Sequence, residues 1–266
     1  MPVAIYFLLN QAFPVIYILM ELKGKVAVIT GSSGRLGSAI AKALGGGGCN
    51  CICHYNSNEQ GARKVAEQIR DLGAAALAIG ADLTDPEQID DLFAKAGELG
   101  VPQILINSAA VFSRQPLKDI TFQQAQSVLS LNLTAAILTS RAFAKAIADR
   151  FSGADTALGK IINISDIGGV RPWGEYVLYC SSKAGLIGAT KAMAKELAPC
   201  ICVNSVAPGL ANWPSDFDEA AKKRQLSFIP MARLAGQNEI TEAILFLLKN
   251  DYITGQVLNV DGGRCI

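Results

Sequence analysis

Tyr179 and Lys183 are the residues of this sequence best suited to transferring a proton. They lie four positions apart in the stretch YCSSK, and on a helix this spacing puts both side chains on one face. A nearby ammonium favours the phenolate, so Lys183 is expected to lower the pKa of Tyr179 from about 10 toward the pH at which a general acid works best. The alternative is a surface tyrosine and lysine that share helical spacing only.

A glycine-rich segment, TGSSGRLG at residues 30–37, follows an apolar strand and precedes a helical sequence. Gly31 permits a sharp turn, Gly34 keeps the loop small, and Gly37 lets the helix approach the sheet. The helix N-terminus then presents free N–H groups to a pyrophosphate. This position, in the first strand–helix unit, favours a dinucleotide site over a merely structural turn.

The elements that must position these residues form a repeated strand–helix pattern from Lys25 onward. Because the strands are apolar at nearly every position, they are expected to be buried on both faces of a parallel sheet. We therefore predict an α/β fold, a doubly wound Rossmann-type parallel sheet with helices on both faces, in a single domain. The expected strands are 26–30, 51–55, 104–107, 161–165, 202–207 and 257–260.

Composition excludes several classes of protein. Of 266 residues, 50% are apolar and 18% are charged, which is typical of a globular protein and not of a disordered chain. The formal charge, 24 − 23 = +1, gives no reason to expect a nucleic-acid or anionic-membrane partner. A small-molecule substrate is expected instead.

The seven cysteines include C-x-C-x-C at Cys49, Cys51 and Cys53. Alternate positions of a strand share one face, so these cysteines are expected to be small buried hydrophobes in a reducing cytoplasm, with a metal or disulfide site as the alternative. His54 is the only histidine. A histidine-rich metal site is therefore excluded.

Residues 1–20 form an apolar extension close to the length of a membrane span. No basic residue precedes Lys23, and Asn10, Gln11 and Pro14 interrupt the run, so a membrane anchor is the less favoured interpretation. We expect the folded domain to cover 21–266, residues 1–19 to derive from an upstream start codon, and the segment to pack on the body or on another subunit.

Residues 21–266 resemble the classical short-chain dehydrogenase/reductase family, whose glycine motif is T-G-x-x-x-G-x-G. The matching motifs follow in the family's order: ADL at 81–83, NSAA at 107–110, LNLTA around Asn132, YCSSK at 179–183, APG at 207–209 and VDGG near the end. The resemblance implies a nicotinamide cofactor and association into oligomers, often tetramers, through long helices at about 122–150 and 176–197.

The resemblance also implies roles for individual residues. Tyr179 is the proton donor, Lys183 holds the nicotinamide ribose, and Asn132 supports a water in the proton relay. For Asn132 the alternative is a helix-interior amide bound to a backbone carbonyl. The residues expected to bind the cofactor are Gly31, Ser33, Arg35, Leu36, Gly37, His54, Asn56, Ser57, Asn58, Asp82, Leu83, Asn107, Ser108, Ala109, Tyr179, Lys183, Pro208 and Gly209.

The end of the second strand indicates which cofactor is used. An NAD-specific site places a carboxylate there, on the ribose 2′-OH. This chain reads CHYNSNEQ, with neutral donors from His54 to Asn58 and no acid before Glu59, and Arg35 adds a cation. We therefore predict NADPH. The alternative is a solvated strand end whose donors face water.

Three departures from the family pattern resemble pteridine reductases. Arg35 replaces the middle glycine, Asp166 stands thirteen before Tyr179 in place of the catalytic serine, and Phe112 follows NSAAV. In that subfamily such an arginine and aspartate line the substrate site, and the phenylalanine stacks a pterin. Tyr176 also matches a tyrosine there, whereas Ser57 replaces a basic residue.

Each departure has a simpler explanation. Asp166 could cap a loop, Phe112 could be core, Arg35 could bind only cofactor phosphates, and a local shift could bring Ser165 into the serine's place. The favoured function is NADPH-dependent reduction of a dihydropterin or dihydrofolate ring, with Asp166 sharing the proton delivered to a ring nitrogen. The alternatives are a 3-oxoacyl-thioester carbonyl reductase and a non-catalytic dinucleotide-binding sensor.

Overall fold

The computed structural model describes residues 20–150, 158–213 and 217–266. The expectations for residues 1–19 lie outside these ranges. Seven strands form one sheet in the order β3-β2-β1-β4-β5-β6-β7, and every neighbouring pair is parallel. The strands are β1 (Val26–Ile29), β2 (Asn50–Tyr55), β3 (Ala76–Gly80), β4 (Pro102–Asn107), β5 (Gly159–Ile164), β6 (Ile201–Pro208) and β7 (Val257–Val260).

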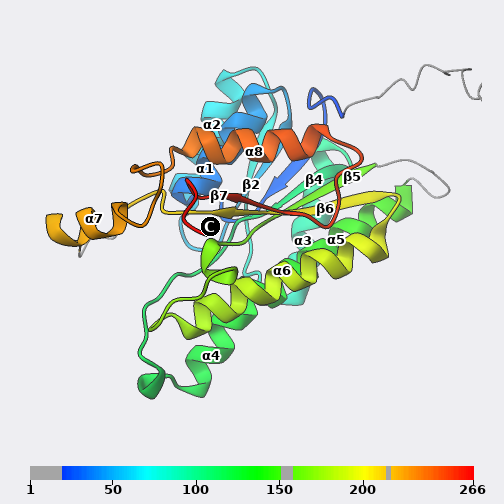
Figure 1. The fold of residues 1–266 in the computed structure, drawn as a ribbon. Helices are drawn as coiled ribbons and strands as arrows, with labels where there is room; N and C mark the ends of the chain where they lie inside the picture. Colours follow the sequence, from blue (N-terminus) through cyan, green and yellow to red (C-terminus); the bar gives the residue numbers. More distant parts are fainter. Residues whose placement is uncertain (1–19, 151–157, 214–216) are drawn as a thin grey trace, which may run out of the picture.

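Helices cover both faces of this sheet, so the predicted fold class is confirmed (Figure 1). One face carries α1 (Arg35–Gly46), α2 (Glu59–Asp71) and α8 (Gln237–Lys249). The other carries α3 (Pro86–Ala96), α5 (Ala135–Arg150) and α6 (Val177–Leu197). The remaining helices are α4 (Phe122–Leu129), α7 (Glu219–Leu226), the short 3-10 turns Gly97–Leu99, Leu117–Asp119 and Ile167–Gly169, and a π turn at Ser130–Thr134.

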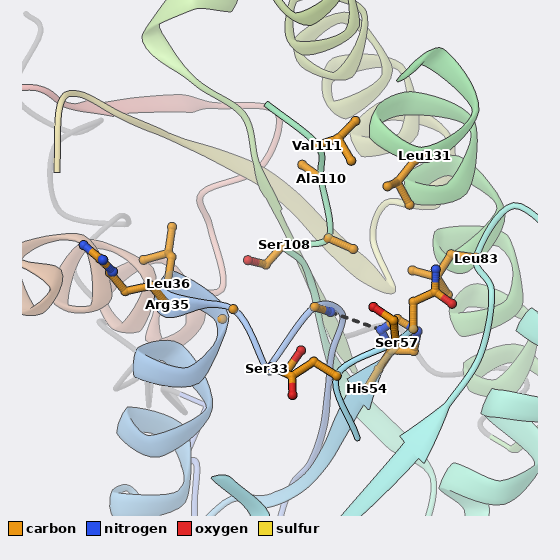
Figure 2. Close-up of a pocket in the computed structure, with 16 residues that line it drawn as sticks. Ser33, Arg35, Leu36, His54, Ser57, Leu83, Ser108, Ala110, Val111 and Leu131 are labelled. Carbon is orange, nitrogen blue, oxygen red and sulfur yellow. Dashed lines mark hydrogen bonds between the residues drawn. The ribbon is translucent and has the colours of Figure 1, made fainter. Parts of the chain in front are cut away.

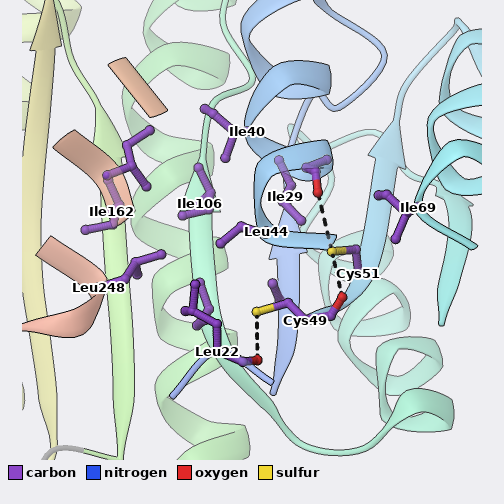
Figure 3. Packing of buried hydrophobic residues seen from close by; sticks show 14 of the residues in the cluster. Leu22, Ile29, Ile40, Leu44, Cys49, Cys51, Ile69, Ile106, Ile162 and Leu248 are labelled. Atoms are coloured by element: carbon purple, nitrogen blue, oxygen red, sulfur yellow. Dashed lines mark hydrogen bonds between the residues drawn. The ribbon is translucent and has the colours of Figure 1, made fainter. Parts of the chain in front are cut away.

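The two hydrophobic cores lie on opposite faces of the strands. On the α1 and α8 face, Cys49, Cys51 and Cys53 are fully buried in one cluster, as their alternate spacing predicts (Figure 3). The Cys49 thiol donates to the Leu22 carbonyl at 3.1 Å, and burial raises the pKa of this thiol to about 12. These side chains therefore behave as small core residues.

Two elements differ from the expectation. β3 was not among the strands identified from sequence, because ALAIG has few β-branched residues. The helix expected over 122–150 is divided into α4 and α5 by the π turn. Within the described residues, the helix over Phe122–Arg150 is the one that is long and apolar enough to cross a membrane, judged by length and composition alone. Of its apolar window, 44% is buried inside the protein. A core helix passes the same test, and Phe143 and Ile147 of α5 are core residues.

The sheet has its switch point at β1. The chain moves outward from β1 to β2 and β3, then returns to β4 on the other side. In sheets of this type the crevice for a ligand opens at the carboxyl ends of the strands that flank such a reversal. The segments that follow β1 and β4 should therefore form the binding site.

Candidate active site

A cleft lies between the glycine-rich loop after β1 and the segment after β4. Its volume is about 420 Å³ (Figure 2). Thr30 ties its two walls together, because its hydroxyl donates to the Ile106 carbonyl at 3.3 Å and accepts from the N–H groups of Ser108 and Ala109. The cleft is lined by Gly31, Ser33, Gly34, Arg35, Leu36, Gly37, His54, Asn56, Ser57, Asn58, Leu83, Ser108, Ala109, Ala110, Val111 and Leu131.

Two glycines of the loop have no room for a side chain. Gly31 has φ +66°, and a Cβ there would lie 2.9 Å from the Cα of Ala109. A Cβ on Gly37 would lie 2.3 Å from the Gly31 carbonyl oxygen. The loop therefore brings bare backbone to the N-terminus of α1, as a bound pyrophosphate requires. The residues present fit a dinucleotide.

His54 holds this loop in place. Its Nδ1 accepts from the Gly31 N–H at 3.1 Å, and its Nε2 lies 3.0 Å from the Ala81 carbonyl, to which it can only donate. The ring is therefore neutral with its proton on Nε2, and burial lowers its pKa. Since both ring nitrogens are engaged within the chain, His54 is not the free donor to a cofactor that the sequence suggested.

The end of β2 is polar and uncharged. Asn58 caps α2 by accepting from the Gly61 N–H at 3.0 Å, so its side-chain oxygen is already used. The first carboxylate, Glu59, pairs with Arg63 on the same helix at 2.5 Å. Among the described residues that line the cleft, Arg35 is charged and no acid is present. Figure 2 shows the Arg35 side chain directed away from the Ser57 end of the cleft.

Asp166 and Tyr179 form the central contact of the site. The Tyr179 hydroxyl donates to Oδ2 of Asp166 at 2.8 Å, and Oδ1 of Asp166 accepts from the Gly168 N–H at 2.7 Å. Asp166 thus caps a turn, as the simpler interpretation has it, and also binds the phenol, while its contact with a substrate ring stays a prediction. Burial raises the pKa of its carboxyl, although the Gly168 and Tyr179 hydrogen bonds act in the opposite direction.

The pKa of Tyr179 is not lowered in this structure. Burial raises it first, and the charge and hydrogen bond of Asp166 raise it further. Lys183 lies on the same face of α6, with its Nζ 5.8 Å from the centre of the phenol ring, but it donates to the Ile164 carbonyl at 2.8 Å. Burial lowers the pKa of Lys183 to about 8. Within the chain, burial and Asp166 therefore outweigh the Lys183 charge at Tyr179, and the lowering of the Tyr179 pKa by Lys183 together with the oxidised nicotinamide stays a prediction.

Asn132 lies in the π turn and anchors the segment after β4. Its Oδ1 accepts from the Val111 N–H at 2.8 Å, and its Nδ2 donates to the Val111 carbonyl at 2.9 Å and to the Ser182 hydroxyl at 3.1 Å. The amide is thus held by backbone, as the simpler alternative proposed. Its side chain fixes the residue that precedes Phe112, and its part in a proton relay stays a prediction.

Aromatic rings surround the phenol. Phe112 stacks on Tyr176 with ring centres 5.0 Å apart and meets the Tyr179 ring edge-on at 4.7 Å. Trp173 packs edge-on against Tyr176 at 5.8 Å. Phe112 is 55% exposed, so it is not the core residue of the alternative interpretation. These rings form an apolar surface beside the Tyr179 hydroxyl.

Two loops present this surface, and they are joined to each other. The Gln115 N–H donates to the Glu175 carbonyl at 2.6 Å, next to an isolated parallel bridge between Gln115 and Tyr176. Arg114 pairs with the Glu175 carboxylate at 2.5 Å. Glu175 has φ +66°, a conformation that residues other than glycine rarely adopt. The loops after β4 and β5 therefore hold Phe112 and Tyr176 in fixed relation.

Some of the expected cofactor and substrate residues lie apart from the cleft lining. Asn107 is buried and bonds Ala136, Ser140 and Asn163. Ser165 is also buried, and its hydroxyl bonds Ser205 and the Val206 carbonyl, so it does not replace the serine of the family pattern. Asp82 accepts from the N–H and the hydroxyl of Thr84, and Pro208 and Gly209 lie at the end of β6.

Comparisons with known proteins agree with this geometry. A family model described as enoyl-(acyl carrier protein) reductase matches residues 31–264. The chain is 35% identical over 254 residues to a 3beta-hydroxysteroid dehydrogenase of Eggerthella lenta, covering 92% of this chain and 95% of that protein. It is 35% identical over 253 residues to a 3-oxoacyl-[acyl-carrier-protein] reductase of Aquifex aeolicus, covering 92% and 98%.

A solved structure indicates the same family. A variant of a Serratia marcescens short-chain dehydrogenase/reductase superposes with a TM-score of 0.84 at 29% identity, covering 93% of this chain and 100% of that one. The expected enzyme class is confirmed, which leaves the non-catalytic sensor without support. This chain belongs to the short-chain dehydrogenase/reductase family and is an NAD(P)-dependent oxidoreductase.

Proposed function

We propose that this enzyme uses NADPH to reduce a C=N bond in a pterin-like ring, as in dihydropterins and dihydrofolate. The observation that carries the proposal is the 2.8 Å hydrogen bond between Tyr179 and Asp166. Two acidic groups with raised pKa values share this contact, so at neutral pH the phenol is protonated. The pair can bind the ring edge of an aminopyrimidine and deliver a proton to its nitrogen.

The same pair is poorly suited to a ketone. Reduction of a ketone develops negative charge on oxygen, and an ionised Asp166 carboxylate beside Tyr179 opposes that charge in a partly dry site. A C=N nitrogen is more basic than a ketone oxygen, so Tyr179 can protonate it as hydride arrives, and the Asp166 carboxylate then stabilises the positive charge that develops. When bound, the reduced nicotinamide would supply the hydride, and Asp166 orients the phenol by accepting the hydrogen bond from its hydroxyl.

Two further features support the proposal. The exposed Phe112 ring, stacked on Tyr176, offers a flat surface on which an aromatic substrate can lie beside Tyr179. The cofactor cleft has no acid lining it among the described residues, and a carboxylate there would repel the 2′-phosphate of NADPH. Arg35 also lines the cleft and adds a positive charge, although its side chain is directed away from the Ser57 end.

The second candidate is a 3-oxoacyl-thioester reductase, which the similarity to the Aquifex aeolicus protein favours. The substitution Asp166→Ser separates the two. For a pterin reductase it should lower kcat/KM with dihydrobiopterin while leaving or raising activity on acetoacetyl-CoA. For a carbonyl reductase it should raise the main activity, because a neutral hydroxyl replaces the opposing charge.

The matched control for this experiment is Asp85→Ser. Asp85 also caps a helical segment, accepting from the Glu87 N–H at 3.0 Å, but it begins α3 away from the site. Serine keeps an oxygen that can cap a turn, so both variants should fold. If dihydrobiopterin is not reduced by the wild type, or if Asp166→Ser reduces it unchanged, the proposal is wrong.

The choice of NADPH is tested by equilibrium binding. We expect NADPH to bind at least about tenfold more tightly than NADH, equivalent to about 1.4 kcal/mol. Ser57→Asp should remove this preference by placing a carboxylate at the end of β2, and equal affinities in the wild type would refute it. Fluorescence titration of both cofactors measures the ratio.

We further propose a homotetramer located in the cytoplasm. The long helices expected to form the subunit contacts expose Phe122, Ile137 and Val177, and apolar side chains on such surfaces favour association. The buried thiols of Cys49, Cys51 and Cys53 suit a reducing compartment. Light scattering of the purified protein tests the oligomeric state, and a monomeric mass would refute it.

A further inference from the structure

Two arginines from distant parts of the chain meet beside the proposed substrate site. Arg171 follows the turn that Asp166 caps, and Arg264 lies near the C-terminus, after β7. The Arg171 guanidinium donates from Nη1 to the Arg264 carbonyl at 3.2 Å. The Arg264 guanidinium donates from Nη2 to Oε1 of Gln225 on α7 at 2.5 Å. Three segments therefore hold this pair of cations together.

Neither guanidinium has a carboxylate within ion-pair distance among the described residues. Asp261 is the acid nearest to Arg264 along the chain, but its two carboxylate oxygens accept hydrogen bonds from the N–H groups of Gly263 and Cys265. Burial and the charge of Arg171 lower the pKa of Arg264. Two cations held side by side with no carboxylate of the described chain in ion-pair contact form a site that an anion would stabilise.

The pair also lies close to the reacting groups. The positive charge of Arg264 lowers the pKa of Asp166, against the stronger effect of burial, and Asp166 in turn raises the pKa of Arg264. Asp166 is in hydrogen-bond contact with Tyr179. The Arg171 N–H donates to the Ile167 carbonyl at 2.7 Å, within the turn that Asp166 caps, so the arginine pair lies beside a ring bound at Asp166 and Tyr179.

We propose that Arg171 and Arg264 bind an anionic tail of the substrate, a carboxylate or a phosphate attached to the ring or acyl group being reduced. This inference rests on the proposed function only in placing the reacting group at Asp166 and Tyr179. Planar guanidinium groups bind both carboxylate and phosphate through paired hydrogen bonds. The tail of dihydrofolate carries glutamyl carboxylates, and that of a coenzyme A thioester carries phosphates.

The test compares substrates that differ in the tail. Dihydrofolate is paired with dihydrobiopterin, whose side chain is uncharged, and acetoacetyl-CoA is paired with the neutral acetoacetyl thioester of N-acetylcysteamine. We expect Arg264→Gln and Arg171→Gln each to raise KM for the anionic member about tenfold, with less than about twofold change for its neutral partner. Arg264→Lys, which keeps a cation, should restore much of the affinity.

Arg141→Gln is the matched control, because Arg141 is an exposed arginine on α5 that pairs with Asp90. It should change neither KM. The subsite is refuted if KM rises equally for the anionic and neutral members, since Arg264 would then act on Asp166 or on folding. It is also refuted if neither value changes.

Failure of the subsite can be distinguished from failure of the proposed function. If only the thioesters are reduced, the pterin proposal fails, while the two thioesters still test the arginines. If both pterins are reduced with the same response to Arg264→Gln, the subsite fails and the function stands. If turnover is too slow to measure, the binding of folate and of biopterin to the NADP⁺-loaded protein is followed by tryptophan fluorescence. An equal loss of affinity for both ligands in Arg264→Gln refutes the subsite.

Discussion

The substitution His54→Leu tests whether a buried histidine maintains the cofactor loop. His54 is 2% exposed and makes two hydrogen bonds, to the Gly31 N–H and the Ala81 carbonyl. Leucine fills the space but leaves both backbone groups without a partner, each at about 1–3 kcal/mol. We expect the free energy of unfolding to fall by about 2–6 kcal/mol, and the melting temperature by about 2–4 °C for each kcal/mol lost in a chain of this size.

Cofactor affinity should fall with stability in this variant. Gly31 must keep its turn for bare backbone to reach the pyrophosphate, so we expect the Kd for NADPH to rise about tenfold. The matched control is Asn204→Leu, since Asn204 is also buried and joins a strand to a loop through the Ile253 carbonyl and the Gln256 N–H. It should lose similar stability and keep the affinity. Wild-type affinity in His54→Leu would show that the loop does not depend on His54.

The pH dependence of stability gives a second measurement on the same residue. Burial lowers the pKa of His54 in the folded state, whereas the unfolded chain takes up the proton near pH 6.5. Its contribution to stability is therefore present above pH 6.5 and is lost as the pH falls below it. We expect the decline between about pH 6.5 and 5 to be shallower in His54→Leu than in Asn204→Leu, and equal slopes would contradict the assignment.

Three further predictions concern catalysis and the loop. Tyr179→Phe should abolish turnover with little change in NADPH affinity, because only the transferable proton is lost. Lys183→Ala should impair both turnover and NADPH affinity. Steady-state kinetics measures turnover and fluorescence titration measures affinity, so together they distinguish the two variants. The wild-type kcat/KM should fall above about pH 8, where the Lys183 ammonium loses its proton, and a flat profile would contradict this role. Gly37→Ala should prevent NADPH binding, because its Cβ would lie 2.3 Å from the Gly31 oxygen; retained binding would show that the helix can shift.

Local patterns were enough to predict the parts of the site that depend on local geometry. The spacing of Tyr179 and Lys183 on one helix and the glycine loop between a strand and a helix both follow from backbone periodicity. The apolar strands likewise indicated the parallel sheet. The strand β3 was missed because its alanines and glycine give almost no propensity signal, and its pairing with β2 determines it instead.

Features that depend on tertiary contacts could not be predicted in this way. Ser165 stands one position from the expected serine, yet the register of β5 with β6 turns its hydroxyl toward Ser205. The bonds of His54 reach Gly31 and Ala81, which are 23 and 27 residues away. Arg171 and Arg264 are separated by 93 residues, and neither residue had a motif to single it out.

The π turn at Ser130–Thr134 changes how the two halves of its helix are aligned. A π turn adds one residue to an α-helix, so the side-chain rows of α4 and α5 are offset from each other by about 100°. Removing one residue there would restore a regular helix and rotate the whole of α4 about its axis. The exposed Phe122 would change direction, and Asn132 would lose its alignment with Val111. The length of this turn thus couples the outer surface of the molecule to the wall of its active site.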